Sequence, residues 1–200
     1  MNIFGGYDIR GIFGKDLTLD IVERIGKAFG TMNDGRVVIG YDVRHSSPKM
    51  FNAFTKGVLS TGVDVFDVST VPNPIAYFSS FKLKTDGAFI TASHNPPEFN
   101  GIKFFDSRGV SYLERLKELK KIYEGGKFRK GGGKIERVEM FDEYVNNLSK
   151  NIKINGSIKF VADCFNASGS LVTPHLFDRL GVECMPINNG IKGDFGGLRP

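Results

Sequence analysis

The chain has 200 residues, of which 40% are hydrophobic and 24% charged, a balance that is typical of a globular protein with a buried core and excludes general disorder. Its length suits one ordinary domain plus part of another, since domains usually span about 100 to 150 residues. The net charge of +5 only mildly favours anionic partners, and no apolar run approaches the ~18 residues that cross a membrane.

Helical and extended patterns alternate along the first half of the chain. The predicted elements are a helix capped by Thr18 and ended by Gly30, a strand at 37–39, two helices with Ser47 and Asn73 as caps and Pro48 and Pro74 as first helical residues, and strands at 63–68 and 86–92. Strands that alternate with helices in this way predict a parallel sheet with helical crossovers.

A glycine-rich segment separates this first half from the rest. A charged amphipathic helix is predicted at 113–123, and residues 125–134 then contain five glycines and four cations. We expect a flexible connector in which nothing packs, because this segment lacks the alternating aromatic residues on which nucleic-acid bases stack. No nucleic-acid partner is therefore expected.

The strand and helix pattern restarts near residue 151. After a short helix at 140–148 come a strand at 158–162, a helix at 171–180 and a strand at 182–186. Two strands and one helix leave an apolar face uncovered, with Ile158, Phe160, Leu176 and Val182 on it. We therefore predict an α/β fold with a mixed, mainly parallel sheet and helices on both faces in residues 1–150, followed by the start of a second α/β domain in 151–200.

Two further features place the protein in the cytoplasm. Asp8 and Arg10 interrupt the start of the chain, where a secretion signal needs an apolar stretch, and no membrane association is expected. Cys164 and Cys184 have no Cys-x-x-Cys motif or His pair beside them. They predict buried reduced thiols and give no indication of a zinc site or a disulfide framework.

Ligands of open parallel sheets bind at the carboxyl ends of the strands, so the loops that follow the predicted strands are the places to search. Three of these loops are unusually polar, and they span residues 40–48, 91–97 and 163–169. Residues 7–11 add a compact charged turn near the amino terminus. These four segments hold the candidate functional residues.

The loop at 91–97 combines the Ser93 hydroxyl, the His94 imidazole and the Asn95 amide with a Pro-Pro pair that fixes the backbone. Neighbouring side chains generally point apart, so Ser93 and His94 are not expected to form a nucleophile and its own base, and no Gly-x-Ser-x-Gly motif is present. A serine that carries a phosphoryl group instead needs cations around it. Arg10, Arg44, His94 and Lys103 could supply them.

Residues 91–103, Thr-Ala-Ser-His-Asn-Pro-Pro-Glu-Phe-Asn-Gly-Ile-Lys, closely resemble the phosphoserine loop of the α-D-phosphohexomutases, the phosphomannomutase and phosphoglucomutase family. The segment 7–11, Tyr-Asp-Ile-Arg-Gly, is similar to the family's amino-terminal motif. Asp42-x-Arg44-x-Ser46-Ser47 resembles its second loop. Asp163-x-x-Asn166-x-x-Gly169 resembles the opening of its second domain, although Ala167 stands where a glycine is common.

This resemblance implies a reversible transfer of phosphate between C6 and C1 of a hexose through a bisphosphorylated sugar. Ser93 would be the phosphoserine, its phosphate would be one ligand of Mg²⁺, and His94 and Lys103 would be the general acid and base. Hexose 1,6-bisphosphate would be the activator. The remaining residues expected to bind substrate or phosphate are Tyr7, Arg10, Arg44 and Asn95.

Three motifs of the family are absent from these 200 residues: the Asp-Gly-Asp-x-Asp-Arg metal loop, the Gly-Glu-x-Ser-Gly sugar loop and the carboxy-terminal phosphate loop. We therefore expect an amino-terminal fragment that lacks carboxy-terminal domains and gives no turnover alone. The 7–11 motif favours mannose and glucose phosphates. Two alternatives stay open: a phosphoglucosamine mutase, which residues 100–105 also resemble, and a noncatalytic phosphosugar-binding module.

Overall fold

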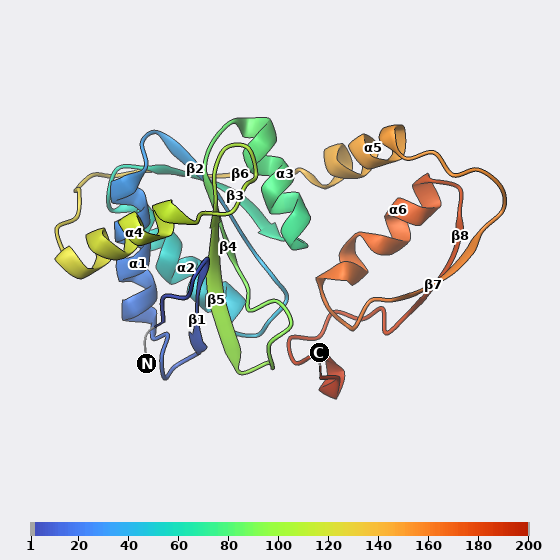
Figure 1. The fold of residues 1–200 in the computed structure, drawn as a ribbon, viewed down its shortest axis with the longest axis horizontal. Coiled ribbons are helices and arrows are strands. Elements are labelled where there is room, and N and C mark those ends of the chain that lie inside the picture. Colours follow the sequence, from blue (N-terminus) through green and yellow to red (C-terminus); the bar gives the residue numbers. More distant parts are fainter. Residues whose placement is uncertain (1–2, 200) are drawn as a thin grey trace.

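A computed structural model describes residues 3–199 as a six-stranded sheet and a two-stranded sheet, each with its own helices (Figure 1). The elements are, in chain order, β1 (Asp8–Ile12), α1 (Leu19–Met32), β2 (Arg36–Tyr41), α2 (Ser47–Leu59), β3 (Asp64–Thr70), α3 (Asn73–Leu83), β4 (Gly87–Ile90), β5 (Phe99–Phe105), α4 (Glu114–Gly125), β6 (Ile135–Arg137), α5 (Phe141–Asn151), β7 (Lys159–Asp163), η1 (Ser168–Leu171), α6 (Thr173–Arg179), β8 (Glu183–Ile187) and η2 (Phe195–Gly197).

The main sheet has the strand order β1-β5-β4-β2-β3-β6. Strands β4, β2, β3 and β6 are parallel, whereas β5 runs antiparallel to both β1 and β4. The α/β fold with a mixed, mainly parallel sheet is therefore confirmed. The charged turn expected at 7–11 is wrong, because residues from Asp8 onward pair with β5 and form an edge strand, with Asp8 opposite Lys103 and Arg10 opposite Gly101.

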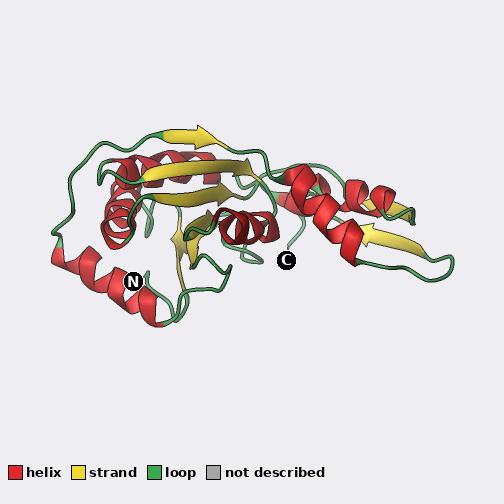
Figure 2. Ribbon diagram, turned by 90° about the horizontal axis from the view of Figure 1, so that it is seen from above, coloured by secondary structure: helices red, strands yellow, loops and turns green. Residues whose placement is uncertain are grey.

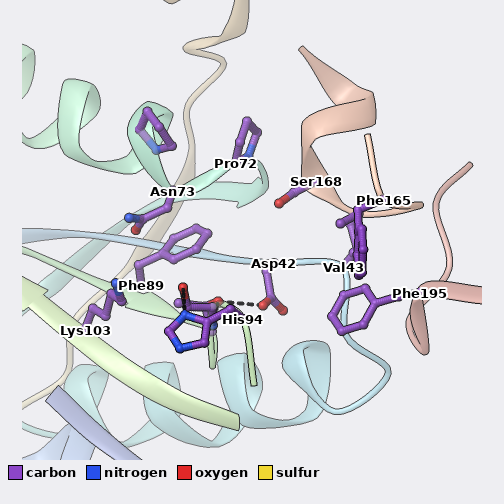
Figure 3. A pocket seen from close by; sticks show the side chains of 14 residues that line it. Asp42, Val43, Pro72, Asn73, Phe89, His94, Lys103, Phe165, Ser168 and Phe195 are labelled. Atoms are coloured by element: carbon purple, nitrogen blue, oxygen red, sulfur yellow. Dashed lines mark hydrogen bonds between the residues drawn. The ribbon is translucent and has the colours of Figure 1, made fainter. Parts of the chain in front are cut away.

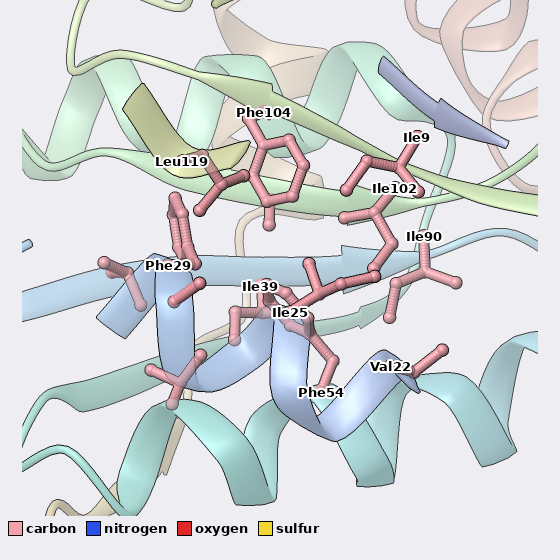
Figure 4. Packing of buried hydrophobic residues seen from close by; sticks show 14 of the residues in the cluster. Ile9, Val22, Ile25, Phe29, Ile39, Phe54, Ile90, Ile102, Phe104 and Leu119 are labelled. Carbon is pink, nitrogen blue, oxygen red and sulfur yellow. The ribbon is translucent and has the colours of Figure 1, made fainter. Parts of the chain in front are cut away.

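Alternating side chains of the central strands feed two cores on opposite faces of the sheet. Val37 and Ile39 of β2 enter the larger core with helices α1, α2 and α4, as Figure 4 shows for Ile39, Phe29 and Phe54. Val38 points to the other face, where it meets helix α3 and the start of α5. Helices thus cover both faces, and the continuous apolar character of β2 follows from its burial on both sides.

Helices α1 and α2 pack unusually close together because glycines line their contact. A Cβ atom on Gly57 would lie 2.1 Å from the Glu23 carbonyl oxygen, and one on Gly26 would lie 2.1 Å from the Phe54 carbonyl oxygen. Thr18 caps α1 as predicted, but the prediction that Gly30 ends this helix is wrong. Gly30 lies inside the helix, where a Cβ would approach the Thr61 hydroxyl within 2.3 Å.

The predicted starts of α2 and α3 are each displaced by one residue. Ser46 occupies the cap position of α2, and Ser47 is its first helical residue, with its hydroxyl bonded to Asp42 instead of to the helix. Pro72 occupies the cap position of α3 ahead of Asn73. At the start of α2, bonds of the Ser46 and Ser47 side chains to Asn100 and Asp42 have therefore replaced the local capping bond that the sequence suggested.

The glycine-rich segment at 125–134 is packed, so the expected flexible connector is wrong. The Arg129 guanidinium donates to the carbonyl oxygens of Gly30, Asn33 and Thr61 at the ends of α1 and α2. Glycine allows close approach here, because a Cβ on Gly133 would lie 2.1 Å from the Val63 carbonyl oxygen. The segment delivers β6 to the edge of the main sheet.

Strands β7 and β8 form a parallel pair with α6, and this second unit lies beyond the carboxyl ends of the main sheet's parallel strands (Figure 2). Ile158 and Phe160 are exposed as expected, whereas Leu176 and Val182 are half-buried. Helix α5 contacts both units, through Tyr144 on Phe78 and through Phe141 on His175. The proposed boundary at residue 150 stays a prediction.

Two smaller expectations concern the cysteines and membranes. Cys164 is buried and Cys184 is half-buried, and both are free thiols. Within residues 3–199 no helix is long and apolar enough to cross a membrane.

Substitution of Gly57 by alanine is expected to lower the free energy of unfolding by about 2 kcal/mol or more. Helix propensity alone favours alanine by about 1 kcal/mol, but a Cβ that overlaps backbone must push two helices apart. Urea denaturation checks this, with Gly125→Ala as control, because Gly125 ends α4 with nothing within 4 Å of an added Cβ. Equal stabilities for Gly57→Ala and Gly125→Ala would contradict the close helix contact.

Candidate functional site

A cavity of about 390 Å³ lies between the carboxyl ends of β2, β3 and β4 and the second unit. On the side of the main sheet it is lined by Lys103, Phe89 and His94, and on the opposite side by Phe165, Ser168 and Phe195 (Figure 3). The carboxyl ends of the strands therefore form a site, as the sequence predicts. The far wall comes from a part of the chain more than sixty residues away.

Ser93 occupies the tip of the loop between β4 and β5 and is exposed at the cavity. Its backbone adopts the left-handed conformation, with φ of 56°, and its N–H donates to the Thr91 hydroxyl over 2.9 Å. A non-glycine residue in this region is strained and must be held by its surroundings.

The expectation that Ser93 and His94 point apart is wrong. Ser93 Oγ lies 3.4 Å from His94 Nδ1, within the range of a long hydrogen bond. Alternation of neighbouring side chains holds for extended strands, whereas the left-handed turn at Ser93 brings the two groups to the same side. The imidazole can therefore exchange a proton with the serine hydroxyl.

Asp42, directly after β2, is a buried carboxylate that links three segments of the site. Its Oδ1 accepts from the Ser47 hydroxyl at 2.5 Å and from the Arg44 N–H at 3.1 Å. Its Oδ2 accepts from Arg44 Nε at 3.1 Å and from the Thr91 hydroxyl at 2.6 Å. Two successive hydrogen bonds, from the Ser93 N–H to the Thr91 hydroxyl and from that hydroxyl to Asp42, hold the strained serine in place.

Arg44 is only 1% exposed, and each of its five guanidinium N–H groups has a protein acceptor. The acceptors are Asp42 Oδ2 and the backbone carbonyl oxygens of Ser93, Asn95, Pro96 and Phe99. Burial lowers the pKa of Arg44, and the neighbouring Asp42 carboxylate opposes this decrease. The guanidinium stays charged. This geometry favours a role in shaping the Ser93 loop over the phosphate-binding role expected from the sequence.

Arg10 reaches the same loop from β1. Its Nη1 donates to Asn95 Oδ1 over 2.6 Å, while its Nε and Nη2 contact Asp8 Oδ2 at 2.9 and 2.8 Å. The side chain is 24% exposed, and the contacts recorded within residues 3–199 leave part of its Nη2 group open to another acceptor. Neither arginine lines the cavity, and of the two only Arg10 has a partly exposed side chain.

The other predicted site residues separate into two groups. Lys103, in the middle of β5, and His94 line the cavity together with Ser93. Tyr7 is 58% exposed just before β1 and does not line the cavity. Asn95 is half-buried and bound to Arg10, so it braces the loop.

Several residues of the site have no clear signal in the sequence. Asn100, fully buried, donates to the hydroxyls of Ser46 and Ser47 and so ties β5 to the loop after β2. Phe165 and Phe195 look like ordinary core residues in the sequence. Only the docking of the second unit brings them to the cavity.

The described part of the chain offers no ready metal site. Within residues 3–199 no cluster of three or more His, Cys, Asp or Glu side chains could hold a metal ion. Asp42 lines the cavity, but both of its oxygens already accept from N–H and O–H donors. These residues alone therefore do not fit the expected Mg²⁺.

The sequence and the overall fold match those of known proteins. Residues 1–130 match the family model described as phosphoglucomutase/phosphomannomutase, alpha/beta/alpha domain I. The chain belongs to this family. A crystal structure of a phosphoglucomutase/phosphomannomutase family protein from Burkholderia thailandensis superposes with a TM-score of 0.89 at 33% identity, covering 97% of this chain and 45% of that one.

Two relatives that are named as other kinds of mutase also align with this chain. A "Probable phosphoglucosamine mutase" of Thermococcus gammatolerans is 39% identical over 199 residues, which is 96% of this chain and 44% of the relative. A "Phosphopentomutase" of Thermococcus kodakarensis is 35% identical over 205 residues, which is 100% of this chain and 46% of the relative. The chain thus spans somewhat less than half the length of these mutases.

Substitution of Arg44 by lysine is expected to lower the free energy of unfolding by about 3 kcal/mol, because it leaves buried carbonyl oxygens without a donor and breaks a buried ion pair. Amide exchange in 93–99 should accelerate at the same time. Chemical denaturation and exchange mass spectrometry measure the two effects.

Arg108→Lys is the matched control. Arg108 makes the same two local bonds to Asp106 that Arg44 makes to Asp42, from N to Oδ1 and from Nε to Oδ2, but its side chain is 76% exposed. No measurable change is expected there, because exposed pairs contribute little. A similar loss for both variants would show that Arg44 is not the support of the loop.

Proposed function

We propose that this chain contributes the phosphoryl-carrying serine of a phosphohexomutase, which interconverts hexose 6-phosphate and hexose 1-phosphate through a bisphosphorylated sugar. One observation carries the proposal. Ser93 is held by buried bonds in a strained conformation that exposes its hydroxyl to a cavity shared with His94 and Lys103. Rigid presentation of a nucleophile lowers the entropic cost of a transfer step.

The transfer itself needs two proton movements. A sugar hydroxyl attacks the phosphorus of phosphorylated Ser93, the bond from phosphorus to Oγ breaks, the hydroxyl proton goes to a base, and Oγ regains a proton from an acid. His94, whose Nδ1 lies 3.4 Å from Oγ, is our candidate for exchange of the serine proton. Lys103, across the same cavity, is our candidate for the sugar hydroxyl. Arg10 would bind the phosphate.

Mg²⁺ would offset the charge of the serine phosphate, which we propose as one of its ligands. The other ligands would not come from a carboxylate cluster within residues 3–199, because that part of the chain has no such cluster. Hexose 1,6-bisphosphate is the proposed activator, since it is the donor that returns a phosphoryl group to free Ser93.

Mannose and glucose phosphates are the substrates we propose first, in line with the segment 7–11 and with the family that the chain belongs to. Glucosamine phosphate is the second candidate. This candidate is favoured by the relative from Thermococcus gammatolerans, a "Probable phosphoglucosamine mutase" that is 39% identical to the chain. A noncatalytic phosphosugar-binding module would share the cavity but would not transfer phosphate.

Incubation of the full-length protein, with the carboxy-terminal domains that we expect, with glucose 1,6-bisphosphate and Mg²⁺ is expected to add one phosphoryl group to wild type and none to Ser93→Ala. Intact-mass spectrometry reads the result, with Ser168→Ala, on the opposite wall of the cavity, as a control that keeps the phosphate. Phosphate that persists on Ser93→Ala, or that never forms on wild type, would contradict the proposal.

In the full-length enzyme, substitution of Lys103 by methionine is expected to slow the transfer of phosphate from Ser93 to mannose or glucose 6-phosphate by about 100-fold, the usual contribution of a general acid or base. Rapid-quench measurement of the loss of phosphoserine gives the rate at saturating sugar. A change confined to the sugar concentration that half-saturates the rate would show that Lys103 only binds.

A further inference from the structure

The Phe195 ring covers the buried guanidinium of Arg44. The guanidinium carbon lies 4.9 Å from the ring centroid, and Phe195 is only 4% exposed. All five N–H groups of Arg44 point in the guanidinium plane to protein acceptors, so only its two faces are left for further contacts. An aromatic ring on one face excludes water and attracts the cation.

Phe195 reaches this position through a strained backbone. Its φ is 60°, and Phe165 and Asn166 in the facing loop have φ of 56° and 50°. A bulky residue in the left-handed region is an outlier that persists only where its surroundings hold it, and such outliers gather at functional sites. Three of them lie together in the second unit, where the rings of Phe165 and Phe195 have centroids 6.0 Å apart.

The surrounding bonds hold the Phe195 turn firmly. Asn166, 8% exposed, donates from Nδ2 to the Phe195 carbonyl oxygen over 3.2 Å and accepts from the Lys192 N–H at its own carbonyl. Asp194 Oδ1 accepts from the Gly196 N–H over 2.9 Å. The turn is therefore built from residues of the second unit alone, yet its ring lies on an arginine of the first.

A second contact beside the ring reinforces the docking. Gly193 lies so close to His45 that an added Cβ would be 2.7 Å from the His45 backbone nitrogen and 2.6 Å from its ring. His45 is the residue directly after Arg44. The second unit thus touches the loop after β2 at two consecutive residues.

We propose that Phe195 is a positioning residue for the reaction at Ser93, which links the placement of the second unit to the conformation of the serine loop. With the ring in place, the Arg44 guanidinium is shielded from water and donates hydrogen bonds to four carbonyl oxygens of residues 93–99. When the second unit moves away, water reaches the guanidinium face, the competing hydration weakens those bonds, and the loop loosens. The link to catalysis depends on the proposed role of Ser93, whereas the effect on the loop does not.

Amide exchange mass spectrometry of the 200-residue chain tests this proposal without requiring any phosphoryl transfer. Phe195→Leu keeps an apolar side chain but removes the ring, and it should speed exchange in 93–99 by about tenfold or more, the scale of a desolvated cation–π contact. Phe195→Tyr, which keeps the ring, should restore slow exchange. Strands β2 and β4 should stay equally protected in all three proteins.

Phe160→Leu is the matched control, because Phe160 is a phenylalanine of the same unit that packs on Phe177 and lies outside the cavity. It should leave exchange in 93–99 unchanged. If Phe195→Leu disrupts the whole second unit, Gly193→Ala gives an independent route to the same contact and should speed exchange in 93–99 as well.

Two outcomes would overturn the proposal. One is unchanged exchange in 93–99 for both Phe195→Leu and Gly193→Ala. The other is an equal increase for Phe160→Leu, which would indicate general destabilisation. Failure of the mutase proposal would give a different result: the full-length wild-type protein would never become phosphorylated at Ser93, although the ring variants loosen the loop.

Discussion

The buried ion pair between Asp42 and Arg44 is the contact on which the site depends. Both residues come from the loop after β2, yet their partners lie on three other segments: the start of α2, the serine loop, and the beginning of β5. Each carboxylate oxygen accepts two bonds and each guanidinium N–H donates one. The pair therefore acts as a complete hydrogen-bonding unit for a loop that has no strand partners of its own.

Burying two charges is expensive, and the cost is justified only when their remaining bonds are satisfied. The serine loop creates such a need, because its tight turns leave backbone carbonyl oxygens pointing inward and an unpaired buried carbonyl is itself costly. A single planar guanidinium meets four of these carbonyls at once. Lysine, with three donors on one flexible nitrogen, could not replace it.

Much of the fold follows from local pattern. The strand and helix order of residues 18–92 was predictable because apolar residues recur at the period of each element and because Thr18 caps its helix through its own side chain. The predictions failed where tertiary packing overrides composition. Gly30 looks like a helix end but serves a close helix contact, and the glycines at 131 and 133 look flexible but allow a backbone to pass against Gly62 and Val63.

The candidate site divides in the same way. Ser93, His94 and Lys103 were identified because a long ordered motif contains them, and the structure brings all three to one cavity. The contact between Ser93 and His94 could not be predicted, since it accompanies a φ of 56° at Ser93, whose backbone is held by Thr91 and Arg44. The role of Phe195 could not be predicted for a similar reason, because its partner, Arg44, is about 150 positions away in the sequence.

Asp42 holds the left-handed backbone of Ser93 through the Thr91 hydroxyl, and we expect the reaction at Ser93 to depend on this link. A double-mutant cycle with Asp42→Asn and Thr91→Val tests it most directly, with the initial rate of Ser93 phosphorylation by glucose 1,6-bisphosphate as the readout. If the two residues act as one unit, the double variant will be hardly slower than the worse single variant, with a coupling energy of about 1 to 2 kcal/mol. Effects on the rate that add to within about 0.5 kcal/mol would contradict the account.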